Sequence, residues 1–210
     1  QQLYHDLGKD LPAITNILVA LTNFLVNMWW LVTIVLGLII YFVFQFVRTD
    51  SGRHILAKVK LNVPVFKLMF WRLYNGRFAR TAENLLSTGV SIQDTLAISA
   101  EAINNLIMEE EIKEVSEKVK QGKTLSASLK ELDYILPLLP QMAAIGEESG
   151  KIDEMLGKAA NVYEDELDQQ INTISTLIEP IMLVIMTLMV AVIIAGVLMP
   201  IYQLVSQIQK

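Results

Sequence analysis

Two long stretches of this chain are predominantly apolar on all sides of a helix rather than on one side. The first is densest over residues 28–47, "MWWLVTIVLGLIIYFVFQFV", and the second covers residues 178–203. A helix of this length rises about 30 Å, which is the thickness of the hydrocarbon core of a bilayer. Buried helices of soluble proteins seldom stay apolar on all faces for so long. We therefore predict transmembrane helices at 28–47 and 178–203.

Between these spans, apolar residues recur at helical spacing, without a strand pattern of useful length. Gly89 suits a helix stop because a glycine after a helix adopts a positive φ without penalty. Ser91 and Asp94 have the spacing of a capping box. The predicted helices run over about 66–87, from 92, over 106–120, after 124, from 137, and from 151 into the second span. The predicted fold class is all-α, with two transmembrane helices flanking a cytoplasmic six-helix bundle.

Lysine and arginine are distributed unevenly around the first span. Residues 1–27 carry only Lys9, and only Lys210 follows the second span. Basic residues are concentrated on the cytoplasmic side of membrane proteins, so both termini are predicted to lie outside. The predicted divisions are an extracytoplasmic or interfacial segment 1–27, the span 28–47, a basic cytoplasmic linker 48–65, a cytoplasmic domain 66–177, the span 178–203 and an extracytoplasmic tail 204–210.

Composition narrows the possible chemistry. The chain has no cysteine, which removes disulfides, thiolate catalysis and cysteine metal sites. Its net charge of -5 makes nucleic acid a poor expected partner, because phosphate contacts need clustered lysine and arginine. It also lacks the GxxxxGK[ST] phosphate loop, so we expect any nucleotide energy to come from a partner.

The segment "GEESGKIDEML", residues 146–156, combines paired acids with a serine. It could be a catalytic site, a metal site or a corner between helices. Gly146 and Gly150 suit a tight corner, and acids near the start of the next helix would be favoured by its dipole. Ser149 as a nucleophile would need a base, and the histidines, His5 and His54, are remote in sequence. The corner is the favoured interpretation, and neither catalysis nor a cofactor is expected.

Two other acidic positions are candidate sites. Glu164 and Asp168 share one helical face and could bind a divalent cation, but they lack the glycine turn and spaced ligands of an EF-hand. A solvated acidic face is favoured there. Glu179 and Pro180 stand at the entrance of the second span, where a carboxylate could recognise a partner or simply reach water.

Several motifs occur in the order found in one family. They are "FARTAENLLSTGVSIQDTL", "QGKTLSASL", "LPLLPQMAAIGEESGKIDEML", "YEDEL" and "LIEPIMLVIM". On these motifs the chain resembles the inner-membrane platform proteins of type II secretion and type IV pilus machines, the secretion F family. Members usually carry two related cytoplasmic domains and three spans, and this chain is similar to the second half. We expect a shortened chain rather than a naturally short member.

The resemblance implies a non-catalytic role in the inner membrane, coupling a cytoplasmic assembly ATPase to insertion and extrusion of pilin or pseudopilin. Other machine subunits, membrane lipid and further copies of the chain are the other expected partners. The alternatives are a transporter or a sensor component, but a transporter would need polar residues within its spans. Positions that match the family motifs, and are therefore candidate partner contacts, are Gly89, Gly146, Glu147, Glu148, Ser149, Gly150, Glu179 and Pro180.

Overall fold

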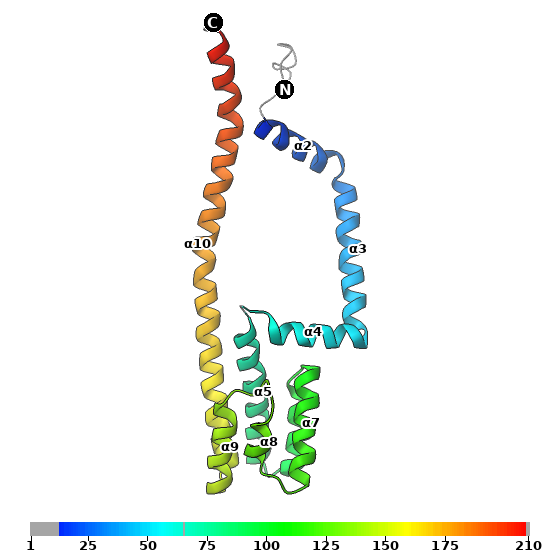
Figure 1. The fold of residues 1–210 in the computed structure, drawn as a ribbon, viewed down its shortest axis with the longest axis vertical. Helices are drawn as coiled ribbons and strands as arrows, with labels where there is room; N and C mark the ends of the chain where they lie inside the picture. The colour runs from blue at the N-terminus through cyan, green and yellow to red at the C-terminus, as the bar shows by residue number, and fades with distance from the viewer. Residues whose placement is uncertain (1–12, 65, 209–210) are drawn as a thin grey trace. The chain divides into compact units, whose positions relative to one another are not determined.

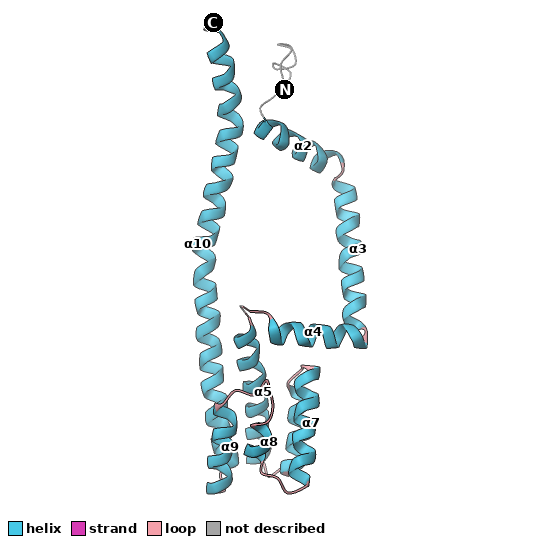
Figure 2. Ribbon diagram, viewed as in Figure 1, coloured by secondary structure: helices cyan, strands magenta, loops and turns pink. Residues whose placement is uncertain are grey.

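The computed structural model describes residues 13–64 and 66–208, and within these ranges every regular element is a helix (Figures 1 and 2). The all-α fold class is confirmed. The helices are α2 (Ala13–Asn27), α3 (Trp29–Arg48), α4 (Asp50–Asn62), α5 (Lys67–Ser87), α6 (Ile92–Ala102), α7 (Leu106–Lys120), α8 (Leu125–Leu129), α9 (Leu138–Ser149) and α10 (Ile152–Ile208).

The chain divides into two compact units. One comprises 1–44 with 175–210, and the other 45–174. In the first, α3 has no buried residue and exposes its apolar side chains. Helix α3 and the part Ile152–Gly196 of α10 are long and apolar enough to cross a membrane, by length and composition. Both predicted spans therefore fall on helices of the required length.

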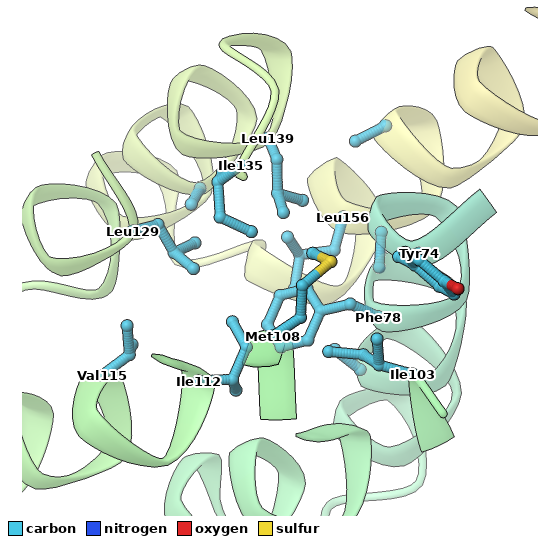
Figure 3. Packing of buried hydrophobic residues seen from close by; sticks show 14 of the residues in the cluster. Tyr74, Phe78, Ile103, Met108, Ile112, Val115, Leu129, Ile135, Leu139 and Leu156 are labelled. Atoms are coloured by element: carbon cyan, nitrogen blue, oxygen red, sulfur yellow. The ribbon is translucent and has the colours of Figure 1, made fainter. Parts of the chain in front are cut away.

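The second unit has a hydrophobic core built by residues from several helices. Phe78, Met108, Ile112, Leu139 and Leu156 are fully buried in it and converge as Figure 3 shows. Helices α5 and α7 begin and end within about one residue of the predicted limits, and α6 begins at the predicted residue. These helix ends could be predicted because the residues that cap a helix lie next to it in the sequence.

Helix α4 lies within the range 48–65 that the sequence analysis treated as a linker. Ala57 and Leu61 are buried on one side of it, against α5 and α7. The Trp71 indole donates to the Leu61 carbonyl at 3.1 Å, and the Asn105 amide donates to the Ala57 carbonyl at 3.3 Å. These contacts make α4 part of the packed unit.

Two buried polar side chains hold the irregular segment before α9. The Asn75 amide donates to the carbonyls of Trp71 and Tyr134, and its oxygen accepts from the Leu136 N–H at 3.1 Å. The Tyr163 hydroxyl donates to the Leu136 carbonyl at 3.2 Å. It also accepts from the N–H of Leu139 at 3.0 Å. Buried backbone groups without partners are costly, so these hydrogen bonds stabilise the part of the segment that is covered by the core.

Arginines of α5 bind the first part of α10. Arg80 donates to the Glu164 carboxylate through Nε, at 3.0 Å, and through Nη2. One turn further along α10, Arg72 lies 2.8 Å from Glu166 and donates to Gln170 at 2.9 Å. Planar guanidinium groups that bind two acceptors at once fix geometry as well as charge. The start of α10 is therefore held to α5 by polar contacts beside its buried residues.

Candidate functional site

The predicted corner between helices is present. Helix α9 ends at Ser149, and Gly150 follows in the left-handed conformation with φ 70°. The Lys151 N–H then donates to the Gly146 carbonyl at 2.9 Å, and α10 begins at the next residue. A Cβ at Gly146 would lie 2.7 Å from the backbone Cα of Ile152, closer than real Cβ atoms approach. Both glycines thus have a backbone role.

Glu147 and Glu148 do not lie where the sequence analysis put them. They belong to the last turn of α9, and the acids in the first turn of α10 are Asp153 and Glu154. The expectation of acids near the start of the next helix is met by Asp153 and Glu154 but not by Glu147 and Glu148. The left-handed residue at Gly150 is the reason, because it ends α9 only after the acid pair.

The carboxylate of Glu147 reaches the first turn of a different helix. It accepts hydrogen bonds from the backbone N–H groups of Leu125 and Ser126 and from the Ser126 hydroxyl. Helix starts carry N–H groups without helical partners, and a carboxylate there also meets the positive end of the dipole. Thr124 caps the same turn by accepting from Ala127. Glu147 therefore joins α9 to α8 and is occupied by structural bonds.

Glu148 and Ser149 differ sharply in their surroundings. Glu148 is exposed, and no hydrogen bond or ion pair to it occurs within the described residues. The Ser149 hydroxyl donates to the Ile145 carbonyl at 2.7 Å. His54 lies on α4 and is 3.6 Å from Glu110, while His5 lies outside the described residues. Of the acid–serine group, Glu148 is the side chain open to a partner.

A groove runs beside this corner between α8 and α9. Its volume is about 500 Å³, and it is continuous with the turn that Glu147 caps through Ser126. No pattern in the sequence indicated this groove, because it depends on the pairing of two helices. The residues that line it are Ser126, Ala127, Lys130, Ile135, Pro137, Pro140, Gln141 and Ala144. Mostly apolar walls with a few polar groups are typical of binding sites.

The acidic face of α10 is partly used internally. Glu164 is the carboxylate bound by Arg80, whereas Asp168 is exposed. Across the part of the chain that the structure describes, no group of three or more His, Asp or Glu side chains is placed to hold a metal ion. The arrangement thus favours an ion-pair role for Glu164.

The remaining candidate residues lie at the end of α5 and within α10. Gly89 ends α5 with φ 84°, and its N–H donates to the Leu86 carbonyl at 2.9 Å. Glu179 and Pro180 are exposed within α10, which continues through both. Pro180 therefore does not interrupt the helix.

Comparison with known proteins places this architecture in a family. The family described as type II secretion system (T2SS), protein F, matches residues 78–200, from the middle of α5 into the apolar part of α10. The chain belongs to this family, which confirms the resemblance drawn from the sequence motifs.

Relatives with assigned names occur in two kinds of system. The type IV pilus assembly protein PilC of Thermus thermophilus is 32% identical over 98% of this chain and 51% of its own length. The type II secretion system protein F of Pseudomonas aeruginosa is 33% identical over 97% of this chain and 50% of its own. The PilC of Myxococcus xanthus is 32% identical over 100% of this chain and 50% of its own. The chain thus spans about half the length of these relatives.

Proposed function

We propose that this chain is part of an inner-membrane platform protein of a type II secretion or type IV pilus machine. In this role it couples a cytoplasmic assembly ATPase to the insertion and extrusion of pilin or pseudopilin and catalyses no reaction itself. The observation that carries the proposal is the family match, which runs without interruption from the packed helical unit into the apolar part of α10. Relatives named for both systems support the choice of machine.

The continuity of α10 supports a mechanical role. One helix contains the core residues Leu156 and Tyr163 and also the apolar stretch after Pro180. Hydrogen bonds between successive turns make a helix stiff along its axis. Arg72 and Arg80 bind its polar part to α5. A displacement of this unit by the ATPase would then be passed along α10 to membrane-embedded partners.

The surfaces suit different partners. The exposed apolar residues of α3 and of the later part of α10 offer faces for bilayer lipid, for pilin helices and for further copies of the chain. The positive-inside rule supports a cytoplasmic location for residues 48–177. On that unit, the exposed Glu148 and the neighbouring half-exposed Ile145 lie beside the groove between α8 and α9. This surface is the candidate contact for the ATPase.

The test is co-purification of the chain with the cognate assembly ATPase in mild detergent. Variants should separate contact from folding, so Glu147, which caps α8, is left intact. Glu148→Ala removes an exposed carboxylate, and Asp165→Ala removes a matched exposed carboxylate on α10. We expect the parent and Asp165→Ala to bind and Glu148→Ala to bind several-fold more weakly.

The possible outcomes test two points separately, the coupling to the ATPase and the location of the contact surface. Failure of the parent chain to retain the ATPase would contradict coupling through this part of the platform. Equal loss in the Glu148 and Asp165 variants would instead indicate that general negative charge, rather than the corner, attracts the partner.

A further inference from the structure

Helix α4 exposes an apolar strip on the side away from the core of its unit. Ile55 is 52% exposed and Val59 47% exposed, and they are one helical turn apart. Ala57 and Leu61 are buried on the opposite side. Ile55 and Val59 thus form an exposed apolar pair on a helix that also carries basic residues.

Basic residues border this strip on both sides. Lys58 and Lys60 immediately flank Val59 in sequence, so they project about 100° to either side of it. Arg53 lies two turns before Lys60 on the same side. Arg53 and Lys60 also line a hollow of about 520 Å³, which Glu101 and Glu109 share from the α6 and α7 side. An apolar strip between cations is the pattern of helices that lie in a membrane surface.

The cations of α4 differ from those of the helices that follow. Within residues 45–174, no ion pair within 4.0 Å joins Arg53, Lys58 or Lys60 to a carboxylate. Ion pairs of that kind engage Lys113, Lys118, Lys120, Lys123, Lys151 and Lys158. Arg53, Lys58 and Lys60 thus form no close ion pair among the described residues of this unit, and Glu101 and Glu109 share only the hollow with Arg53 and Lys60.

The connection from α3 fixes where α4 begins. Thr49 alone separates the two helices, and its N–H donates to the Phe46 carbonyl at 3.1 Å while its hydroxyl oxygen accepts from the Gly52 N–H at 3.1 Å. A Cβ at Gly52 would lie 1.8 Å from the Phe46 carbonyl oxygen, so the turn is too tight for a side chain there. Helix α4 therefore starts within one turn of the apolar helix.

From these features we infer that α4 is an interfacial helix that lies on the bilayer surface where α3 leaves the membrane. Ile55 and Val59 enter the boundary between headgroups and acyl chains, while Arg53, Lys58 and Lys60 contact anionic lipid headgroups. Long basic side chains can reach headgroups while their stems cover apolar surface. The inference rests on the membrane-spanning role of α3 in the proposed function. It adds a second, lateral attachment of the helical unit to lipid.

The absence of cysteine from the chain allows a direct test with single labels. Val59→Cys in the full chain carries an environment-sensitive dye, and Ile98→Cys on α6 is a control with the same 47% exposure. Leu36→Cys on α3 reports insertion itself. Each labelled protein is reconstituted into vesicles of phosphatidylcholine with phosphatidylglycerol. Quenching is measured with lipids spin-labelled near the headgroup for positions 59 and 98, and with lipids spin-labelled deep in the acyl chain for position 36. We expect quenching at position 59 to exceed that at position 98 several-fold.

A second set of vesicles tests the headgroup charge. Attraction of basic residues to an anionic surface is worth about fivefold in partitioning for each cation. The variant Arg53→Gln/Lys58→Gln/Lys60→Gln should therefore lower quenching at position 59 in anionic vesicles toward its value in pure phosphatidylcholine. If quenching is insensitive to both the variant and the lipid charge, the assignment of the cations to headgroups is overturned.

The three labels also separate this inference from the proposed function. Quenching at 36 without quenching at 59 would overturn the surface helix while leaving the span intact. The surface-helix inference is also overturned if the dye at position 59 is shielded from water only in native membranes and not in lipid vesicles. A protein partner would then cover the strip. Lack of quenching at position 36 would contradict the membrane-spanning platform itself.

Discussion

Gly52 is the residue whose replacement the backbone tolerates least at the turn between α3 and α4. We expect Gly52→Ala to destabilise the protein by about 2 kcal/mol, because the Phe46 carbonyl must move away from the new methyl group. Gly37→Ala is the control, since a Cβ at Gly37 meets nothing within 4 Å. The measurement is the apparent melting temperature in detergent, and a Gly52→Ala protein as stable as Gly37→Ala would refute the tight turn.

Glu111 should make stability depend on pH. Burial, together with the carboxylates of Asp133 and Glu114, raises its pKa to about 7. The folded state therefore holds a proton that the unfolded state releases near 4.5, and stability declines as pH rises from about 4.5 to about 7. Because the side chain is only half-buried, we expect a decline of about 1–2 kcal/mol.

Glu111→Gln removes this titration and should flatten the profile between those pH values. Glu148→Gln, at an exposed position, serves as the control and should keep the parent profile. Chemical denaturation across this pH range measures the difference. Parallel profiles for the parent and Glu111→Gln would show that Glu111 contributes nothing to the dependence.

At the scale of elements, the cap that α9 supplies to α8 is testable. Glu147→Gln keeps the shape of the side chain but loses the charge that favours its hydrogen bonds to Leu125 and Ser126. We expect a loss of about 1–2 kcal/mol and faster amide hydrogen exchange in α8. Glu148→Gln should leave both unchanged, and equal effects of the two variants would contradict the cap.

The attachment of α10 to α5 should depend on Arg80. Its guanidinium binds Glu164 and Glu83, and the hydrogen bond to Glu164 raises its pKa above the ordinary value. Because these side chains are partly exposed, we expect Arg80→Met to cost about 1 kcal/mol. A double-mutant cycle with Glu164→Gln should show coupling, and purely additive effects would mean that the ion pair contributes no stability.

Some helices were predicted from the sequence more accurately than others. Helices α5, α6 and α7 were found because their caps and stops are local, such as Ser91, which accepts from the Asp94 N–H at 3.2 Å. Helix α4 was treated as linker because basic residues are interspersed with its apolar ones, and its buried residues, Gly52, Ala57 and Leu61, do not form a long apolar face. The role of Glu147 was missed because it depends on a contact with residues 21 and 22 positions away, which no local pattern reveals.

On the scale of the whole molecule, the predicted topology can be tested by labelling intact cells with a membrane-impermeant maleimide. The chain has no cysteine, so Glu148→Cys and Ser206→Cys, the second in the predicted tail 204–210, each give one reactive thiol. We expect labelling of position 206 at once and of position 148 only after permeabilisation, because the positive-inside rule puts residues 48–177 in the cytoplasm. The reverse pattern would contradict this orientation.

The family and the helical class were predictable from the whole sequence, because ordered motifs and long apolar stretches can be recognised without knowledge of packing. The groove between α8 and α9 and the binding of Arg80 to Glu164 were not, since both arise from elements that meet only after folding. The sequence predicted a corner between helices at Gly146 and Gly150, but it did not predict which groups the nearby carboxylates bind.

The irregular segment before α9 has a consequence for how the helical unit folds. Asn75 from α5 and Tyr163 from α10 satisfy its backbone from opposite ends of the sequence of this unit. The segment has its full set of these hydrogen bonds only when α5 and α10 are both in place, so it couples early and late parts of the chain. A stretch with no regular structure thus makes this unit fold cooperatively, as one body rather than as successive helical hairpins.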